Sequence, residues 1–139
     1  MRSEAKKHIK QMDEREKRTV ARLVSTSLKL LTPRNISASY HCKEQMRKRF
    51  GRFDTTLLHE VVKNSNFVEY KQVWEDGELV DKRVVLRSDE EYMYNNCKYN
   101  LCVVYSLNKR SVVTFWKNKT TFTHENVDLS QYHSSMLVY

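Results

Sequence analysis

The spacing of hydrophobic positions changes about halfway along the chain. In the first half apolar residues recur every three or four positions, which is typical of amphipathic helices. From Phe67 onward, runs rich in β-branched and aromatic residues alternate with charged ones, which is typical of strands. This order predicts an α+β protein in which N-terminal helices precede an antiparallel sheet of four or more strands.

The first predicted helix covers residues 4–31, a stretch without Gly or Pro. Its first half is nearly all charged, so it is expected either as a solvated helix or as an arm that orders on a polyanion. Pro33 ends it, because the residue before a proline is pushed out of the helical region. Apolar residues follow roughly helical spacing at Ala5, Ile9, Met12, Val20, Val24, Leu28 and Leu31.

Shorter helices are expected next. Residues 36–39 form a short extended entry, and Ser39 is a candidate N-cap for a helix over residues 40–50. Asp54 is the candidate cap of a further helix over residues 55–63.

The strands are predicted as hairpins. Asp76-Gly77 is a hairpin signal between strands at 67–74 and 79–86. A second pair is expected at 99–106 and 110–117, and the Tyr- and Asn-rich segment between the pairs is expected to be an exposed loop. The organisation is then a charged N-terminal helix (1–32), an α+β core (33–120) and a tail (121–139) that either docks as a last strand or frays.

Charge points to a polyanionic partner. Lys and Arg number 25 against 17 Asp and Glu, for a net charge of +8. RNA ranks ahead of a membrane, because the chain lacks the roughly 18 consecutive apolar residues of a spanning helix. The charged N-terminus is unlike a secretory signal, so a cytoplasmic site is expected. The three cysteines have no zinc or disulfide spacing, and neither a metal nor another cofactor is expected.

The most informative segment runs from Ser39 to Arg49. His41, Gln45 and Arg49 follow one another at i, i+4 and i+8, so they share one face of the predicted helix. A polar stripe with an imidazole at its N-terminal end is suited to a phosphate-directed site. From spacing alone, a solvent-facing stripe on an amphipathic helix is the more common explanation.

This segment resembles the "S-x-H-x-x-x-R-x-x-x-R" helix of a group of small ribonuclease-like domains. Ser39-Tyr40-His41 and Arg49 carry the motif, and the helix and closing strands that follow have the same order. The group includes RegB-type phage endoribonucleases and toxin-like domains of the barnase–EndoU–colicin–RelE superfamily. The resemblance covers residues 36–117 and implies a RelE-like fold.

The resemblance implies a metal-independent endoribonuclease for single-stranded RNA, in which a ribose 2′-hydroxyl attacks the adjacent phosphate. His41 is then the acid or base, and Arg49 matches the family's second arginine. The chain departs from the pattern at Gln45, where an arginine is expected, and a glutamine supplies no charge. Arg47, Lys48, Arg83 or Arg87 are the cations that could take over.

Other candidates are less specific. His59 is a possible second catalytic histidine, although an apolar-flanked helix histidine is more often a packing or capping residue. Thr114, Trp116 and Lys117 end the last clear strand, where this fold places residues that touch the scissile phosphate. Trp116 is suited to stacking a base, or equally to packing on the sheet. Tyr92, Tyr94 and Tyr99 are suited to RNA, or to an ordinary loop.

Alternative functions stay open at this point. The first is a catalytically inactive RelE-like protein that binds RNA or a host protein, as in a phage or mobile element, where the site would be the host cytoplasm. An inhibitor protein is a further possible partner. DNA binding ranks third, because the break at Thr32-Pro33 is unlike the tight turn of a helix-turn-helix.

Overall fold

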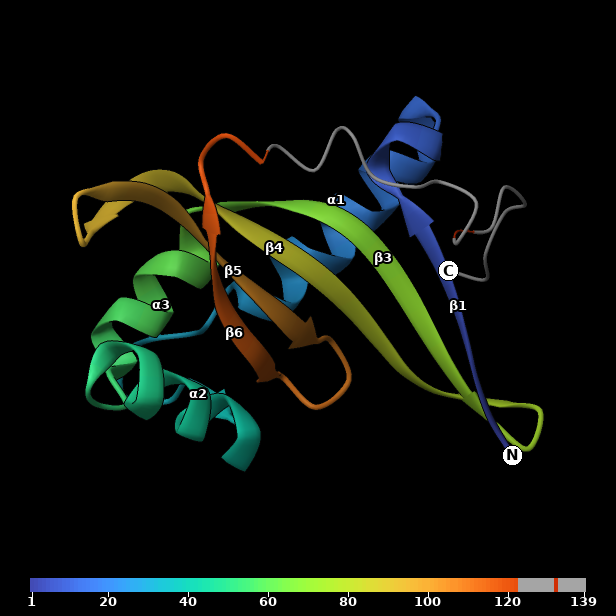
Figure 1. Cartoon of the computed structure of the whole chain (residues 1–139). Helices are drawn as coiled ribbons and strands as arrows, with labels where there is room; N and C mark the ends of the chain where they lie inside the picture. Colours follow the sequence, from blue (N-terminus) through green and yellow to red (C-terminus); the bar gives the residue numbers. More distant parts are fainter. Residues whose placement is uncertain (123–131, 133–139) are drawn as a thin grey trace.

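The computed structural model describes residues 1–122 and residue 132, and residues 123–131 and 133–139 lie outside this description. The described residues form three α-helices and a six-stranded sheet, in the strand order β1-β3-β4-β5-β6-β2 (Figure 1). The predicted α+β class is therefore confirmed. The elements are β1 (Arg2–His8), the 3-10 turn η1 (Ile9–Gln11), α1 (Glu14–Leu28), β2 (Ser37–Ala38), α2 (Tyr40–Phe50), α3 (Thr55–Lys63), β3 (Ser65–Glu75), β4 (Glu78–Tyr94), β5 (Cys97–Ser106) and β6 (Ser111–Lys119).

The helix-first order is wrong, because the chain begins with a strand. Residues 2–8 pair antiparallel with β3, from Arg2 opposite Glu75 to His8 opposite Glu69. The helix begins only at Glu14, after Asp13 caps it by accepting a hydrogen bond from the Glu16 backbone N–H at 2.8 Å. The Asp13-x-x-Glu16 capping box marks this start in the sequence and was missed.

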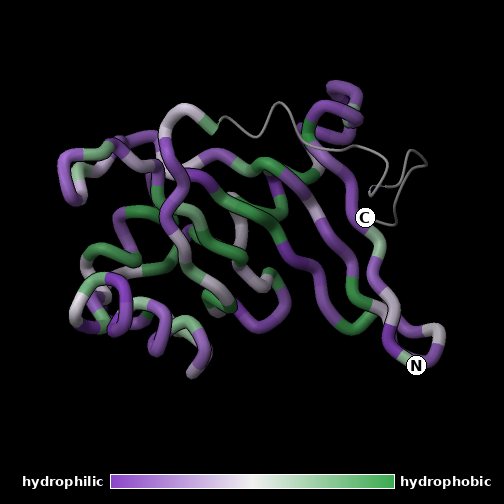
Figure 2. The backbone as a smooth tube through the Cα atoms, in the orientation of Figure 1, coloured by the Kyte–Doolittle hydropathy of each residue, from purple (hydrophilic) through white to green (hydrophobic). Residues whose placement is uncertain are grey.

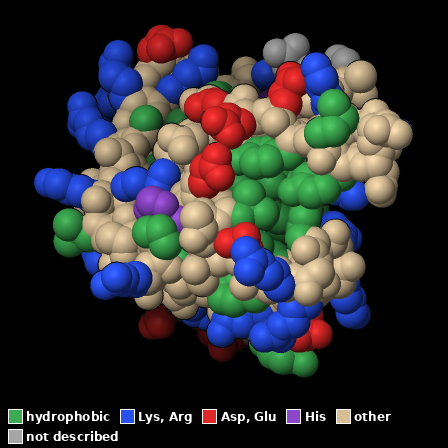
Figure 3. Space-filling view, turned by 90° about the vertical axis from the view of Figure 1, so that its left-hand side faces the viewer, with side chains coloured by type: hydrophobic (Ala, Val, Ile, Leu, Met, Phe, Trp, Pro, Cys, Tyr) green, Lys and Arg blue, Asp and Glu red, His purple; other side chains and the backbone are tan. Residues whose placement is uncertain are grey.

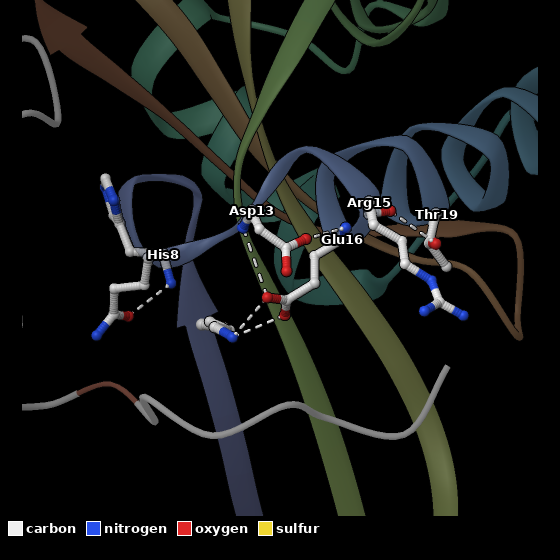
Figure 4. Close-up of polar contacts among 7 residues, drawn as sticks. His8, Asp13, Arg15, Glu16 and Thr19 are labelled. Carbon is white, nitrogen blue, oxygen red and sulfur yellow. Dashed lines mark hydrogen bonds and ion pairs between the residues drawn. The ribbon is translucent and has the colours of Figure 1, made fainter.

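A buried ion pair ties β1 to α1. Lys7 is 2% exposed and Glu16 is 5% exposed. The Lys7 ammonium lies 2.7 Å from Glu16 Oε2 and 2.9 Å from Oε1, and Figure 4 shows the carboxylate reaching from the first turn of α1. Both charges are removed from water, so each needs the opposite charge beside it to offset its lost hydration.

The two shorter helices lie where the sequence predicted them. Ser39 caps α2 by accepting from the Cys42 backbone N–H at 3.0 Å, and Asp54 caps α3 by accepting from Leu57 N–H at 3.1 Å. α2 ends at Gly51, whose φ of +85° is the left-handed conformation that a glycine adopts without strain.

The central hairpins are longer than predicted. Asp76-Gly77 forms the expected turn, with φ values of 49° and 82°. β4 and β5 continue to a second tight turn at Asn95 and Asn96, with φ values of 50° and 65°. The segment expected as an exposed loop is thus a β-hairpin, since asparagine tolerates the left-handed conformation.

All three helices pack on one face of the sheet. The core between them includes Val20, Met46, Leu58, Tyr70, Tyr105 and Phe115. In Figure 2 the hydrophobic stretches lie along the central strands and α3, while α2 is largely hydrophilic. Within the described residues no helix packs on the opposite face, where Tyr132 contacts Lys6, His8 and Glu69. The predicted docking of the tail as a last strand lies outside the described residues.

No helix among the described residues has both the length and the apolar character to cross a membrane.

Replacing Glu16 with Ala should lower the free energy of unfolding by about 3–5 kcal/mol, because it leaves the Lys7 ammonium buried without a counter-charge. Urea unfolding followed by circular dichroism measures the change. Glu14→Ala is the matched control, since Glu14 pairs with Lys17 at the surface and should cost less than about 1 kcal/mol. Equal effects of the two substitutions would contradict this account of the ion pair.

Candidate functional site

The N-terminus of α2 is held against the outer edge of β6. β2 pairs with β6 only at Ser37 and Ala38, in parallel register. Ser39 continues the contact, with its backbone N–H donating to the Val112 carbonyl at 2.8 Å and its hydroxyl donating to the Val113 carbonyl at 2.7 Å. The same hydroxyl also caps the helix, so one side chain fixes both the helix start and its place on the strand.

Gln45 makes the next contact along this edge. Its side-chain Oε1 accepts a hydrogen bond from the Phe115 backbone N–H at 3.0 Å. An arginine has five donors and no acceptor, so it cannot take this bond. The chain therefore differs from the family motif at position 45 for a physical reason. Gln45 accepts a hydrogen bond from a backbone N–H at the edge of β6.

His41 lies between these two anchors. Ser39 and Gln45 contact Val113 and Phe115, which flank Thr114 on β6. His41 precedes Gln45 by four residues and shares its helical face, so the backbone of His41 runs beside the Thr114 segment. Its side chain is exposed. Among the described residues it makes no hydrogen bond or ion pair, which leaves both ring nitrogens available to a ligand.

Three cations of α2, Arg47, Lys48 and Arg49, lie toward its other end. Arg49 is exposed in the last turn of the helix, on the His41 and Gln45 face. Arg47 pairs with Glu44 at 2.5 Å, and Lys48 is exposed. Arg49 is accordingly the exposed α2 cation that shares the helical face of His41, about two turns further along the helix.

His59 serves a different part of the fold. Its Nε2 lies 2.9 Å from the carbonyl oxygen of Leu31, in the segment that follows α1. This contact joins α3 to a chain position 28 residues earlier. The structure therefore does not pair His59 with His41, and it supports the packing interpretation of His59.

The predicted residues of β6 point to opposite faces of the sheet. Phe115 and Lys117 are on the helix-bearing face, as the buried Phe115 in the core shows. Thr114 and Trp116 alternate with them and lie on the helix-free face. Trp116 and Lys117 thus cannot contact one phosphate from the same side.

Arg87 shares the helix-free face with Trp116. The register places Trp116 opposite Cys102, and Cys102 opposite Arg87. With neighbouring strands about 4.8 Å apart, the two backbones are separated by roughly 10 Å. Arg87 donates to Asn100 Oδ1 at 2.6 Å and also to the Phe122 carbonyl. Asn100, a residue that no sequence motif marks, therefore orients Arg87.

Arg83 is occupied by a buried carboxylate. Its Nε donates to Asp81 at 2.7 Å, and Asp81 is 3% exposed. The other oxygen of Asp81 accepts from the Ser106 hydroxyl at 2.8 Å. Arg83 therefore stabilises the sheet, whereas the guanidinium of Arg87 is held by Asn100 and the Phe122 carbonyl.

The cysteine next to His41 is not a nucleophile. Cys42 is fully buried, and burial raises the pKa of its thiol to about 12. Because the thiolate is the reactive form, Cys42 is inert near neutral pH. Across residues 1–122 and Tyr132, no three His, Cys, Asp or Glu side chains gather as the ligands of a metal would.

A hollow of about 470 Å³ lies elsewhere, between α1, α3 and the start of β3. Val24, Leu28, Val62 and Phe67 are among its lining residues. None of the predicted site residues lines it, so the candidate site is the surface at the outer edge of β6 and not this hollow.

Comparison with family models, curated proteins and solved structures gave no match to this chain.

Gln45→Ala should lower the free energy of unfolding by about 1 kcal/mol, because the Phe115 N–H loses its acceptor. Gln45→Arg should lose a similar amount, whereas Gln45→Glu keeps an acceptor and should retain most of the stability. Chemical denaturation measures all three. Lys48→Ala, at an exposed position of the same helix, is the control and should stay within about 0.5 kcal/mol. An arginine variant as stable as the parent would refute this role of Gln45.

Proposed function

We propose that the protein is a metal-independent endoribonuclease acting on single-stranded RNA at the outer edge of β6. The observation that carries the proposal is the placement of His41. Ser39 and Gln45 fix its helical turn beside Thr114, while the imidazole itself stays exposed and without a protein partner in the described residues. A rigid backbone under an accessible imidazole is what general acid–base catalysis requires.

In the proposed reaction, neutral His41 removes the proton from a ribose 2′-hydroxyl. The 2′-oxygen attacks the adjacent phosphorus, the bond from phosphorus to the 5′-oxygen breaks, and water protonates that leaving oxygen. The imidazolium of His41 then returns its proton to the hydroxide that is left. The products are a 2′,3′-cyclic phosphate and a new 5′-hydroxyl end. His59 is left out, because its ring is bound to the Leu31 carbonyl.

The surroundings supply binding and charge stabilisation. Arg49 offers a guanidinium on the same helical face, suited to the negative charge that develops on phosphate oxygens. The Thr114 hydroxyl lies on the adjoining strand segment, and Trp116 follows it on the same face as a platform for a base. The net charge of +8 attracts RNA at long range.

A specific observation favours a second candidate function, an RNA-binding protein without catalysis. The Gln45 carboxamide oxygen is occupied by the Phe115 N–H, and Arg47 is paired with Glu44. Arg49 is then the main cation on the His41 face of α2, which is little charge for stabilising a phosphorane-like transition state. Such a protein would bind RNA through the same edge and leave it intact.

Incubation with labelled mixed-sequence RNA in EDTA should give fragments ending in 2′,3′-cyclic phosphate. His41→Ala should reduce the cleavage rate by about 10²–10⁴-fold, because it removes the proposed base. End-group analysis and gel electrophoresis measure product identity and rate. Circular dichroism should show a folded variant, since the His41 side chain is exposed.

His59→Gln is the matched control, because glutamine keeps a polar side chain for the Leu31 carbonyl while removing the imidazole. It should cleave at close to the parent rate. Cleavage by His41→Ala at the parent rate would refute the role of His41. Intact RNA with tight binding by the parent would favour the non-catalytic candidate.

A further inference from the structure

Aromatic and apolar side chains gather where α2 and α3 meet the β4–β5 hairpin, on the helix-bearing side of the molecule. Figure 3 faces this side and shows a continuous hydrophobic patch, bordered by carboxylates along one margin and by Lys and Arg side chains below it. The half-buried members of this aromatic patch are Phe50, Phe53, Leu57, Tyr92, Tyr94 and Tyr99.

The rings of the aromatic patch support one another. Phe50 packs edge-on against Tyr94 at 5.1 Å and against Phe115 at 5.2 Å between ring centroids. Tyr94 lies 6.2 Å from Tyr99 across the hairpin. Phe115 belongs to the buried core, so the patch is a rigid extension of the core to the surface.

Cations lie within the aromatic patch. The Lys117 ammonium is 5.5 Å from the centre of the Tyr94 ring and 4.8 Å from that of Tyr99. Lys43 lies 5.5 Å from the ring of Phe53. An apolar protein partner would have to desolvate these ammonium groups, which is costly, whereas a phosphate would accept from them.

Carboxylates border the aromatic patch on the α3 side. Burial, together with the neighbouring carboxylate of Glu90, raises the pKa of Glu60. Asp54 stands at the start of the same helix. This margin repels phosphates, so a polyanion on the patch is directed toward Lys117 and the end of α2.

We propose that Tyr94, Tyr99 and Lys117 form a second base-stacking subsite for single-stranded RNA, on the opposite face of β6 from Trp116. The proposal rests on RNA as the substrate class of the proposed function. Stacking on tyrosine tolerates any base, and an adjacent ammonium neutralises the following phosphate. Because Trp116 and Tyr99 lie on opposite faces of the sheet, a strand that contacts both has to pass around β6, the strand beside which α2 lies.

The test measures RNA affinity in a His41→Ala background, which prevents cleavage during the titration. Fluorescence anisotropy of a labelled oligouridine is recorded in EDTA. Tyr99→Leu keeps an apolar side chain on the hairpin but removes the aromatic face, and it should weaken binding by about tenfold. Tyr99→Phe should bind nearly as the parent does.

Lys117→Ala should weaken binding and lower the slope of log K against log salt by about 0.7, the value for one phosphate contact on a single strand. Lys98→Ala removes the same charge from the other face of the hairpin, where Lys98 pairs with Glu91 at 3.9 Å. Met93→Ala is the apolar control on that face, at 60% exposure. Neither control should change the affinity beyond about twofold.

Unchanged affinity in folded Tyr99→Leu would overturn the subsite and would favour a protein partner for the aromatic patch. Equal losses in Lys117→Ala and Lys98→Ala would also overturn it, because charge alone would then explain binding. Absence of RNA binding by the parent would overturn it as well. If the chain with His41 intact never cleaves RNA but Tyr99→Leu still weakens binding, the catalytic proposal fails and the subsite stands.

Discussion

The outer edge of β6 must have its backbone hydrogen-bonding groups satisfied, and the way this chain does so determines the candidate site. β2 is too short to cover the strand, since it pairs only with Ser111 and Val112. Side chains from α2 take over: the Ser39 hydroxyl binds the Val113 carbonyl and the Gln45 carboxamide binds the Phe115 N–H. Without these contacts the edge would be open to pairing with another chain. Instead, α2 is bound to it in a fixed position.

The side chains of β6 point alternately to the two faces of the sheet. Phe115 and Lys117 belong to the helix-bearing face, whereas Thr114 and Trp116 belong to the other. Strand alternation makes this division inescapable once Phe115 is buried in the core. His41 belongs to the helical turn that Ser39 and Gln45 hold against the edge of β6.

Much of the local structure was predictable from the sequence. Ser39, Asp54 and the Asp76-Gly77 pair act through their nearest neighbours, and each performs the predicted role. The N-terminal strand was not predicted, because apolar residues at roughly helical spacing, in a stretch without Gly or Pro, favour a helix. The strand depends on β3, which lies far along the chain. The burial of Lys7 depends on Glu16, and the capping box at Asp13 was the local signal that separated the two elements.

The candidate site shows the same limit. The shared face of His41, Gln45 and Arg49 followed from helical spacing, but the partner of Gln45 depends on which strand lies beside α2. The contact of His59 with Leu31 spans 28 residues and has no local signature. Likewise, Trp116 and Lys117 are neighbours in sequence, and both were predicted to contact RNA. Only the burial of Phe115 shows that their side chains lie on opposite faces of the sheet.

The net charge of +8 overstates the positive charge available at any one contact. Arg47 and Arg83 are paired with carboxylates, and Arg87 is bound to Asn100. Long-range attraction depends on the total charge, whereas a specific contact depends on cations without such partners. The exposed Arg49, on the same helical face as His41, and Lys117, which contacts the rings of Tyr94 and Tyr99, therefore matter more than their share of the charge. Each can bind a phosphate without breaking an ion pair.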